Sequence, residues 1–267
     1  RDLARALAAE IERASGAEAA RLWSELAALH EGPLDLPKDA VSARLAALAL
    51  APHVPAMHDL AAAACARAGE LARYVAAVSD LIEHSENDKS EPDGSEPDGS
   101  EPDGSEPEGS ARDGNRDHTV DLLLRLGRAL EAEPGDTARA VLVYQRAESL
   151  LEDRPLDPRL FDLWKALERC FVRENEPDLI ARVLEKRVRV AAGPERADAL
   201  YALADLRLAT PATHDTGLDL LVEATALDPD LDRAEAALRR AASSTTATPS
   251  ARAPRLLERF AREKSRP

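Results

Sequence analysis

Three stretches of this 267-residue chain repeat one order of large apolar and small side chains. Each stretch has a large apolar residue, a leucine three positions later, and Ala or Gly directly after that leucine. Spacings of three and four positions place these side chains on one face of a helix. The three sets are Trp23, Leu26 and Ala27; Leu123, Leu126 and Gly127; and Leu200, Leu203 and Ala204.

A second helical pattern follows each stretch at a constant distance. It starts with a small residue 13 positions after the small residue of the first pattern and continues at spacings of four and three. The sets are Ala40, Arg44, Ala47 and Leu50; Ala140, Tyr144, Ala147 and Leu150; and Gly217, Leu221, Ala224 and Leu227. We expect each pair of helices to form a hairpin in which the small residues allow close approach. The side chains expected to be buried at these hairpin contacts are Trp23, Leu26, Leu126, Tyr144, Leu167, Leu203 and Leu221. One hairpin cannot bury both of its faces, so the hairpins must stack.

These hairpins resemble the tetratricopeptide repeat, a family whose first helix carries Trp-x2-Leu-Gly and whose second carries Ala-x3-aromatic-x2-Ala, then Pro. The matching residues are Trp23 with Leu26, Trp164 with Leu167, the pair Leu126-Gly127, Ala140 with Tyr144 and Ala147, and the prolines Pro52 and Pro229. Arg44 stands where the family has an aromatic residue, and no single repeat holds the whole signature. The resemblance covers roughly residues 2–242 and implies an all-α fold, a superhelical α-α solenoid of helical hairpins.

Weaker hairpins are expected at residues 53–84 and 158–192, between the well-matched ones. Proline and glycine fall between the periodic segments and separate the elements. The predicted helices cover residues 2–14, 17–31, 38–50, 54–68, 70–84, 117–132, 136–152, 157–174, 176–192, 195–209, 215–227, 231–242 and 251–264.

A five-residue repeat, Ser-Glu-Pro-Asp-Gly, runs from Ser90 to Ser110 and interrupts the helical pattern. The second helices of the weaker hairpins, and the start of the chain, share the motif apolar-Ala-Arg. We compared the distance from the arginine of this motif to the large apolar residue of the next first helix. It is 18 residues from Arg5 to Trp23 and from Arg182 to Leu200, but 50 residues from Arg73 to Leu123. The difference, 50 − 18 = 32, indicates an insertion into an ordinary turn between helices.

The predicted organisation follows from this insertion. Residues 1–84 form helical hairpins, and residues 85–116 form a disordered acidic insert, because proline, glycine and like charges oppose a packed core. Residues 117–242 continue the same array, and residues 243–267 form a polar break and a terminal helix.

Charge narrows the partners that the chain is expected to bind. The net charge is −15, of which residues 84–117 hold −9 (12 acidic and 3 basic side chains). A net negative protein lacks the cations that neutralise nucleic-acid phosphates or anionic lipid, so we expect neither nucleic acid nor membrane as a partner. No apolar stretch is long enough for a membrane-spanning helix.

No pattern predicts catalytic, cofactor or metal chemistry. His53 and His58 are five residues apart, which places them on different sides of a helix, whereas ligands on one helix sit three or four apart. Cys65 and Cys170 are expected to be small buried apolar residues. Because the chain begins with Arg1 and Leu3 already lies in a repeat, we expect a fragment of a longer protein. Its Ala, Arg and Leu bias suggests a bacterial source, and the cytoplasm is the default location.

The family resemblance implies a non-catalytic scaffold that binds a protein or peptide segment in a concave groove lined by first-helix residues. On this chain the implied groove residues are Leu124, Arg128, Lys165, Arg169 and Tyr201. The three basic side chains favour an acidic segment or a carboxylate. Two alternatives stay open: a regulatory or catalytic helical-repeat part of a larger enzyme, and self-association through an open end of the array.

Overall fold

The computed structural model describes residues 1–87, 109–228, 231–243 and 252–264. These residues form thirteen α-helices and one short 3-10 helix, and no strand is found among them. The prediction of an all-α array of helical hairpins is confirmed. The chain divides into two compact units, residues 1–151 and 152–267, which are described separately.

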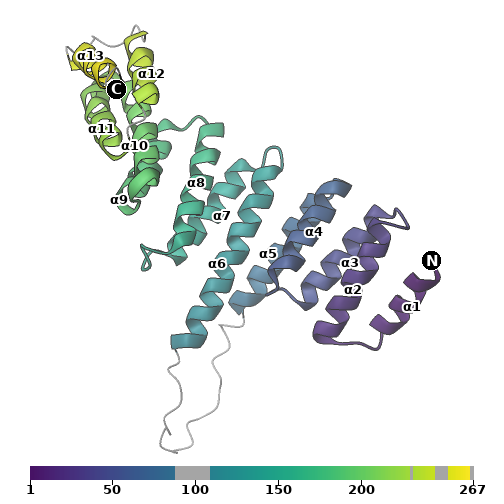
Figure 1. The fold of residues 1–267 in the computed structure, drawn as a ribbon. Helices are drawn as coiled ribbons and strands as arrows, with labels where there is room; N and C mark the ends of the chain where they lie inside the picture. Colours follow the sequence, from purple (N-terminus) through teal and green to yellow (C-terminus); the bar gives the residue numbers. More distant parts are fainter. Residues whose placement is uncertain (88–108, 229–230, 244–251, 265–267) are drawn as a thin grey trace, which may run out of the picture. The chain divides into compact units, whose positions relative to one another are not determined.

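In the first unit each helix packs on the next one along the chain (Figure 1). Two of its helices begin with a proline, Pro37 and Pro55, at a position where the missing N–H costs no hydrogen bond. The helices are α1 (Asp2–Ile11), α2 (Gly16–Glu31), α3 (Pro37–Leu50), α4 (Pro55–Ala68), α5 (Leu71–Asn87), α6 (Gly109–Ala132) and α7 (Thr137–Leu150).

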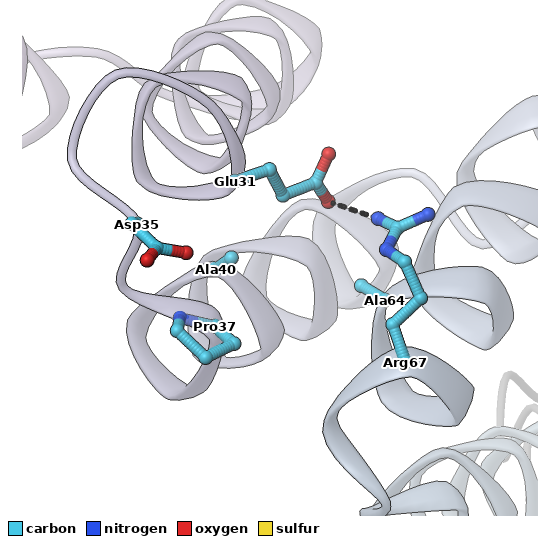
Figure 2. A pocket seen from close by; sticks show the side chains of 6 residues that line it. All are labelled: Glu31, Asp35, Pro37, Ala40, Ala64 and Arg67. Atoms are coloured by element: carbon cyan, nitrogen blue, oxygen red, sulfur yellow. Dashed lines mark ion pairs between the residues drawn. The ribbon is translucent and has the colours of Figure 1, made fainter.

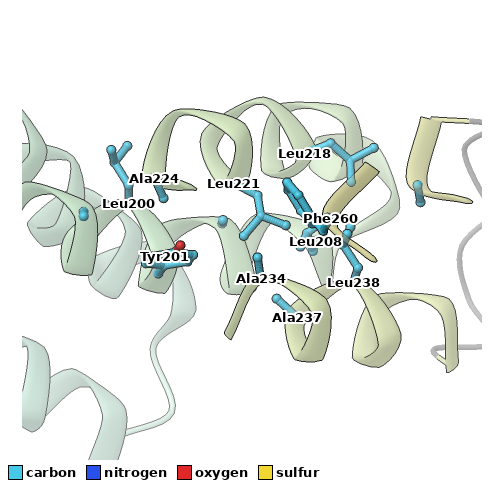
Figure 3. Close-up of a cluster of buried hydrophobic side chains, with 13 residues drawn as sticks. Leu200, Tyr201, Leu208, Leu218, Leu221, Ala224, Ala234, Ala237, Leu238 and Phe260 are labelled. Carbon is cyan, nitrogen blue, oxygen red and sulfur yellow. The ribbon is translucent and has the colours of Figure 1, made fainter. Parts of the chain in front are cut away.

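The second unit repeats this arrangement of consecutive packed helices. Its helices are α8 (Pro158–Arg173), α9 (Pro177–Val190), α10 (Gly193–Leu208), the 3-10 helix η1 (Pro211–Thr213), α11 (His214–Leu227), α12 (Leu231–Ser243) and α13 (Arg252–Lys264). Figure 3 shows a core of this unit, a cluster of buried side chains that includes Tyr201 of α10, Leu221 of α11, Leu238 of α12 and Phe260 of α13. The terminal helix is therefore packed on the array through its apolar face.

Some predicted boundaries differ from the structure. Helix α5 continues to Asn87 and α6 begins at Gly109, so both ends of the expected insert are helical. The Asn115 side chain of α6 donates a hydrogen bond to the Ser85 carbonyl of α5 at 3.4 Å, which ties these extensions together. The rest of the expected insert, residues 88–108, lies outside the described residues. Helix α1 ends at Ile11, and η1 has no counterpart in the prediction.

The side chains predicted to fill the hairpin contacts are buried, with one exception. Those confirmed as buried are Leu26, Leu126, Tyr144, Leu167, Leu203 and Leu221. Trp23 is only partly buried, because the cluster to which it belongs is built from α1 and α2 alone. The corresponding Trp164 of α8 is 5% exposed.

The small residues that lie 13 positions apart mark the closest approach of the two helices in a hairpin. Ala27, Ala40, Ala140 and Ala204 are at most 1% exposed. A Cβ atom on Gly127 would lie within 2.8 Å of three atoms of the Tyr144 ring, a distance that real Cβ contacts do not reach. A Cβ atom on Gly217 would lie 2.8 Å from the backbone nitrogen of Leu208, which cannot rotate away. Glycine is therefore required at both positions by packing.

The ion pair between Arg44 and Glu31 explains why an arginine can replace the aromatic residue in the first hairpin. Arg44 is 5% exposed, and its Nε and Nη2 donate to the two carboxylate oxygens of Glu31 at 3.0 and 3.1 Å. Its Nη1 donates to Ser24 Oγ at 2.6 Å. A buried guanidinium is tolerated when its charge is paired and its donors are used, and both conditions are met.

The same two positions recur in the other well-matched hairpins with different chemistry. In the α6–α7 hairpin the Tyr144 hydroxyl donates to Glu131 at 3.2 Å, again across 13 residues. In the α10–α11 hairpin the pair is Leu208 and Leu221, both at most 2% exposed. One backbone geometry thus accepts an ion pair, a neutral donor to a carboxylate, or an apolar contact.

We expect Gly127→Ala to lower the free energy of unfolding by about 1–3 kcal/mol, because the new methyl group overlaps the Tyr144 ring. The double variant Gly127→Ala/Tyr144→Leu copies the Ala204 and Leu221 combination and should lose less than the sum of the two single changes. Urea denaturation of the four proteins measures this coupling. Strict additivity would mean that the ring and the glycine do not share one contact.

We expect Glu31→Gln to cost about 1–3 kcal/mol at neutral pH, because it removes the charge that pairs with a buried guanidinium. The hydrogen bond from Arg44 lowers the pKa of Glu31 below its ordinary value of 4.5. The native carboxylate therefore contributes stability that is complete above that value and is lost as the pH falls through the lowered pKa. Urea midpoints measured between about pH 6 and pH 3 should fall less for the variant than for the parent chain. Glu25→Gln, in an exposed pair with Arg21, is the matched control and should change stability by less than about 0.5 kcal/mol.

We expect deletion of residues 88–108, with a short Gly-Ser linker joining α5 to α6, to change the melting temperature by less than about 5 °C. The reason is that α5 and α6 contact each other directly. Deletion of residues 86–115 also removes the first turns of α6, including Asn115, and should lower the melting temperature further. Equal effects of the two deletions would show that the start of α6 contributes no stability.

Candidate functional site

Two of the five predicted groove residues lie in the core. Leu124 is 7% exposed and Tyr201 is 2% exposed. The Tyr201 hydroxyl donates to the Asp228 carbonyl at 2.9 Å, and the Arg233 guanidinium lies over the Tyr201 ring, 4.5 Å from its centre. Both side chains are used in packing α6 and α10, so neither is presented to a partner.

The three predicted basic residues belong to different units. Arg128 lies on α6 in the first unit, and Lys165 and Arg169 lie on α8 in the second. Arg128 and Arg169 are exposed, and Lys165 is partly exposed.

In the second unit a hollow of about 520 Å³ lies over α8 and α9, and we call it the basic hollow. Helix α8 supplies most of its wall, from positions three and four apart that share one face. The lining residues are Lys165, Glu168, Arg169, Val172 and Arg173 of α8 and Arg187 of α9. Four cations and one carboxylate thus surround an open space on a protein of net negative charge.

Local sequence sets where α8 begins and ends. Asp157 precedes Pro158, and its carboxylate accepts a hydrogen bond from the Arg159 backbone N–H at 2.9 Å, which caps the first turn. The Arg159 side chain also donates to this carboxylate, and that hydrogen bond is the main cause of a lowered Asp157 pKa. Asn175 follows the helix in the left-handed region (φ 56°) and turns the chain into α9.

Arg187 forms the base of the basic hollow and is 7% exposed. Its guanidinium is paired with the Glu168 carboxylate, so the one acidic group of the lining is already neutralised from within. The Nε atom of Arg187 is buried and has no hydrogen-bond partner. At the rim, the Lys165 ammonium lies 5.7 Å from the centre of the Phe161 ring and 3.7 Å from a Glu195 oxygen. Because this pair with Glu195 is long and exposed, it leaves the Lys165 charge largely available.

Val172 adds an apolar element to the basic hollow. It is 59% exposed and directly precedes Arg173, another lining residue, in the sequence. Cations around an exposed apolar side chain suit a peptide that offers carboxylates beside a small apolar residue.

In the first unit Arg128 borders a hollow of about 320 Å³ between α4 and α6, with α5 beneath. Its walls are mainly alanines, and Leu71 and Tyr74 of α5 also contribute to it. Arg125 of α6 bridges to Asp59 of α4 at 2.7 Å, which joins the two helices across this groove. The groove therefore has two arginines and one aspartate among a mainly apolar lining.

A smaller pocket of about 160 Å³ lies beside the turn between α2 and α3 (Figure 2). Figure 2 shows the Arg67 guanidinium of α4 directed at Glu31, with 3.2 Å between the paired atoms. Since Glu31 also accepts from Arg44, its carboxylate is fully used in holding α2, α3 and α4 together. This pocket is explained by structure alone.

Other candidate chemistry has structural explanations. Cys65 and Cys170 are buried, as predicted, and burial raises the pKa of the Cys65 thiol. No group of three or more potential metal ligands is found in the described part of the chain. None of the helices in that part is long and apolar enough to cross a membrane.

The sequence prediction named two of the four cations that line the basic hollow, Lys165 and Arg169, and missed Arg173 and Arg187. Lys165, Arg169 and Arg173 are spaced by four, so the helical period alone could have added Arg173. Arg187 could not be added this way, because only the α8–α9 hairpin contact brings it beside Glu168.

Comparison with known proteins adds little beyond the geometry. No family model matches the chain, and no curated protein matches it. A solved structure, the APC/C hetero-tetramer Cut9–Hcn1, is similar to it at 15% sequence identity with a TM-score of 0.35, covering 83% of this chain and 42% of that chain. The chain thus spans less than half the length of the protein it matches, and at this TM-score the likeness supports no functional conclusion. The packing described above defines the class: an all-α array of helical hairpins.

Proposed function

We propose that this chain is a protein-interaction scaffold, and that the basic hollow on α8 and α9 binds an acidic segment of a partner protein. One observation carries the proposal: the hollow is lined by four cations and a single carboxylate, and that carboxylate is already paired with Arg187. A carboxylate of a partner would gain charge-assisted hydrogen bonds there, which are stronger than neutral ones.

The scaffold itself supplies what such a site requires. Lys165, Arg169 and Arg173 project from consecutive turns of one helix, so their separations are held by backbone hydrogen bonds. Trp164 and Leu167 of α8 are at most 5% exposed and hold the helix on its neighbours. The basic side chains therefore meet a ligand without a loop having to be ordered first, which lowers the entropic cost of binding.

The net charge of the chain adds a second, longer-range effect. An acidic peptide is repelled by most of a protein whose net charge is −15. A cationic hollow on this acidic protein attracts such a peptide to one site. It therefore increases the difference in binding free energy between that site and the rest of the surface. Two other hypotheses stay predictions: that the array is part of a larger enzyme, and that it associates with itself.

The test uses a fluorescein-labelled synthetic peptide of alternating Glu and Val residues and fluorescence anisotropy with the full chain. We expect the triple change Lys165→Ala/Arg169→Ala/Arg173→Ala to raise the Kd by at least about tenfold, since each lost charge-assisted bond contributes on the order of 1 kcal/mol. The dependence of the Kd on salt should flatten as well. Far-ultraviolet circular dichroism should stay unchanged, because all three residues lie at the surface of α8.

The matched control removes three exposed arginines of the same unit, as Arg182→Ala/Arg189→Ala/Arg255→Ala, which changes the net charge equally. This variant should bind the peptide like the parent chain, and Arg128→Ala should do the same. If the control weakens binding as much as the triple change, the interaction is nonspecific charge attraction and the proposed site is wrong. If only Arg128→Ala weakens it, the peptide binds in the α4–α6 groove.

A further inference from the structure

A buried histidine joins three parts of the first unit. His58 of α4 is 2% exposed, and both of its ring nitrogens have partners. Nε2 lies 2.8 Å from the carbonyl oxygen of Pro52 in the turn between α3 and α4, and Nδ1 lies 3.2 Å from the Tyr74 hydroxyl of α5. The Pro52 carbonyl only accepts hydrogen bonds, so Nε2 carries a proton and donates it. In the neutral ring Nδ1 then accepts from the Tyr74 hydroxyl.

Burial keeps this arrangement uncharged. Desolvation raises the pKa of Tyr74 to about 12, so its hydroxyl stays a donor. Desolvation also lowers the pKa of His58, although the bond to Pro52 opposes this. Nearby Arg125 and His118 of α6 lower the pKa further, since a charged His58 ring would be repelled by them.

A second histidine lies on the other side of the same junction. His118 is partly buried on α6, and desolvation lowers its pKa as well. Thr119 and Val120, which follow it, are almost fully buried, so this turn of α6 is held against its neighbours. The titratable and charged groups that act on the two rings are His53 before α4, Asp59 of α4, Tyr74 of α5, and Arg125 and Asp121 of α6.

We propose that His58 and His118 make the packing of α6 on α4 and α5 sensitive to pH, so that this junction is tight at neutral pH and loosens on mild acidification. Protonation of either ring places a cation in a poorly solvated junction that already contains Arg125. Two carboxylates, Asp59 and Asp121, face the rings, but Asp59 is bound to Arg125 at 2.7 Å. The α4–α6 groove, whose walls both helices supply, would lose its shape together with the junction.

The direction of the effect follows from linkage. Both histidines bind a proton more weakly in the packed state than in an open state with the ordinary histidine pKa of 6.5. The open state therefore takes up more protons as the pH falls below 6.5, and the packed state is favoured fully only above that value. Carboxylates such as Glu31 act at lower pH, outside this window.

The test is amide hydrogen exchange of the full chain, followed by mass spectrometry at about pH 7.5 and pH 5.5 and corrected for the intrinsic pH dependence of exchange. We expect the opening constants of peptides from α4, α5 and α6 to rise by about threefold or more at the lower pH. Peptides from α8 and α9, which contain none of the six histidines, are the internal reference and should not change.

Substitution assigns the effect to the two rings. His118→Gln and His58→Gln should each reduce the pH-dependent rise, whereas His84→Gln, an exposed histidine on α5, should leave it intact. Proton NMR titration of the parent chain provides a measurement that does not depend on the variants folding: two histidine Hε1 resonances should titrate below 6.5. The proposal is overturned if protection of α4–α6 is the same at both pH values, or if the rise persists in both glutamine variants. None of these outcomes bears on peptide binding by the basic hollow.

Discussion

The close approach of two helices at paired small residues is the contact on which the rest of this structure depends. Residues 13 positions apart lie at this contact in each well-matched hairpin, and where one of them is glycine there is no space for a methyl group. Such an approach brings the flanking large side chains into the same layer, where they are buried from both sides. Aromatic residues make up only 3% of the chain, so few large rings are present to fill the space between helices. The core becomes dense because the helix backbones approach each other closely instead.

The position facing this contact shows how much chemical variety one geometry accepts. Arg44 with Glu31, Tyr144 with Glu131, and Leu221 with Leu208 occupy equivalent places. The polar versions keep their buried donors satisfied by a carboxylate at the edge of the hairpin, and the apolar version needs no partner. The small residue opposite follows the size of its neighbour, with glycine under the Tyr144 ring and alanine where Arg44 or Leu221 stands.

The basic hollow on α8 and α9 and the junction around α4 and α6 differ in where their charged and polar groups lie. On α8 the charged residues that point outward repeat every four positions, and the helix is held by a fully apolar inner face, so a cationic hollow costs the fold little. Around α4 and α6, by contrast, polar groups such as His58 and Tyr74 are buried within the packing itself. Charge on a rigid surface suits recognition, whereas a titratable group inside a junction ties packing to solution conditions.

The sequence by itself determined the helical class, thirteen helices near their observed places, and the buried side chains of the hairpin contacts, because periods of three and four residues encode which face of a helix is apolar. The family resemblance also pointed to Lys165 and Arg169, which line the basic hollow. It failed for Leu124 and Tyr201, which a family pattern assigned to a surface and which this chain buries, and for Trp23, whose burial depends on how many helices cover it. Arg187 with Glu168, Arg44 with Ser24 and Glu31, and His58 with Tyr74 were decided only by the tertiary structure. Each of these contacts joins different helices, and the distance between two helices is set by packing, which no period along a single helix contains.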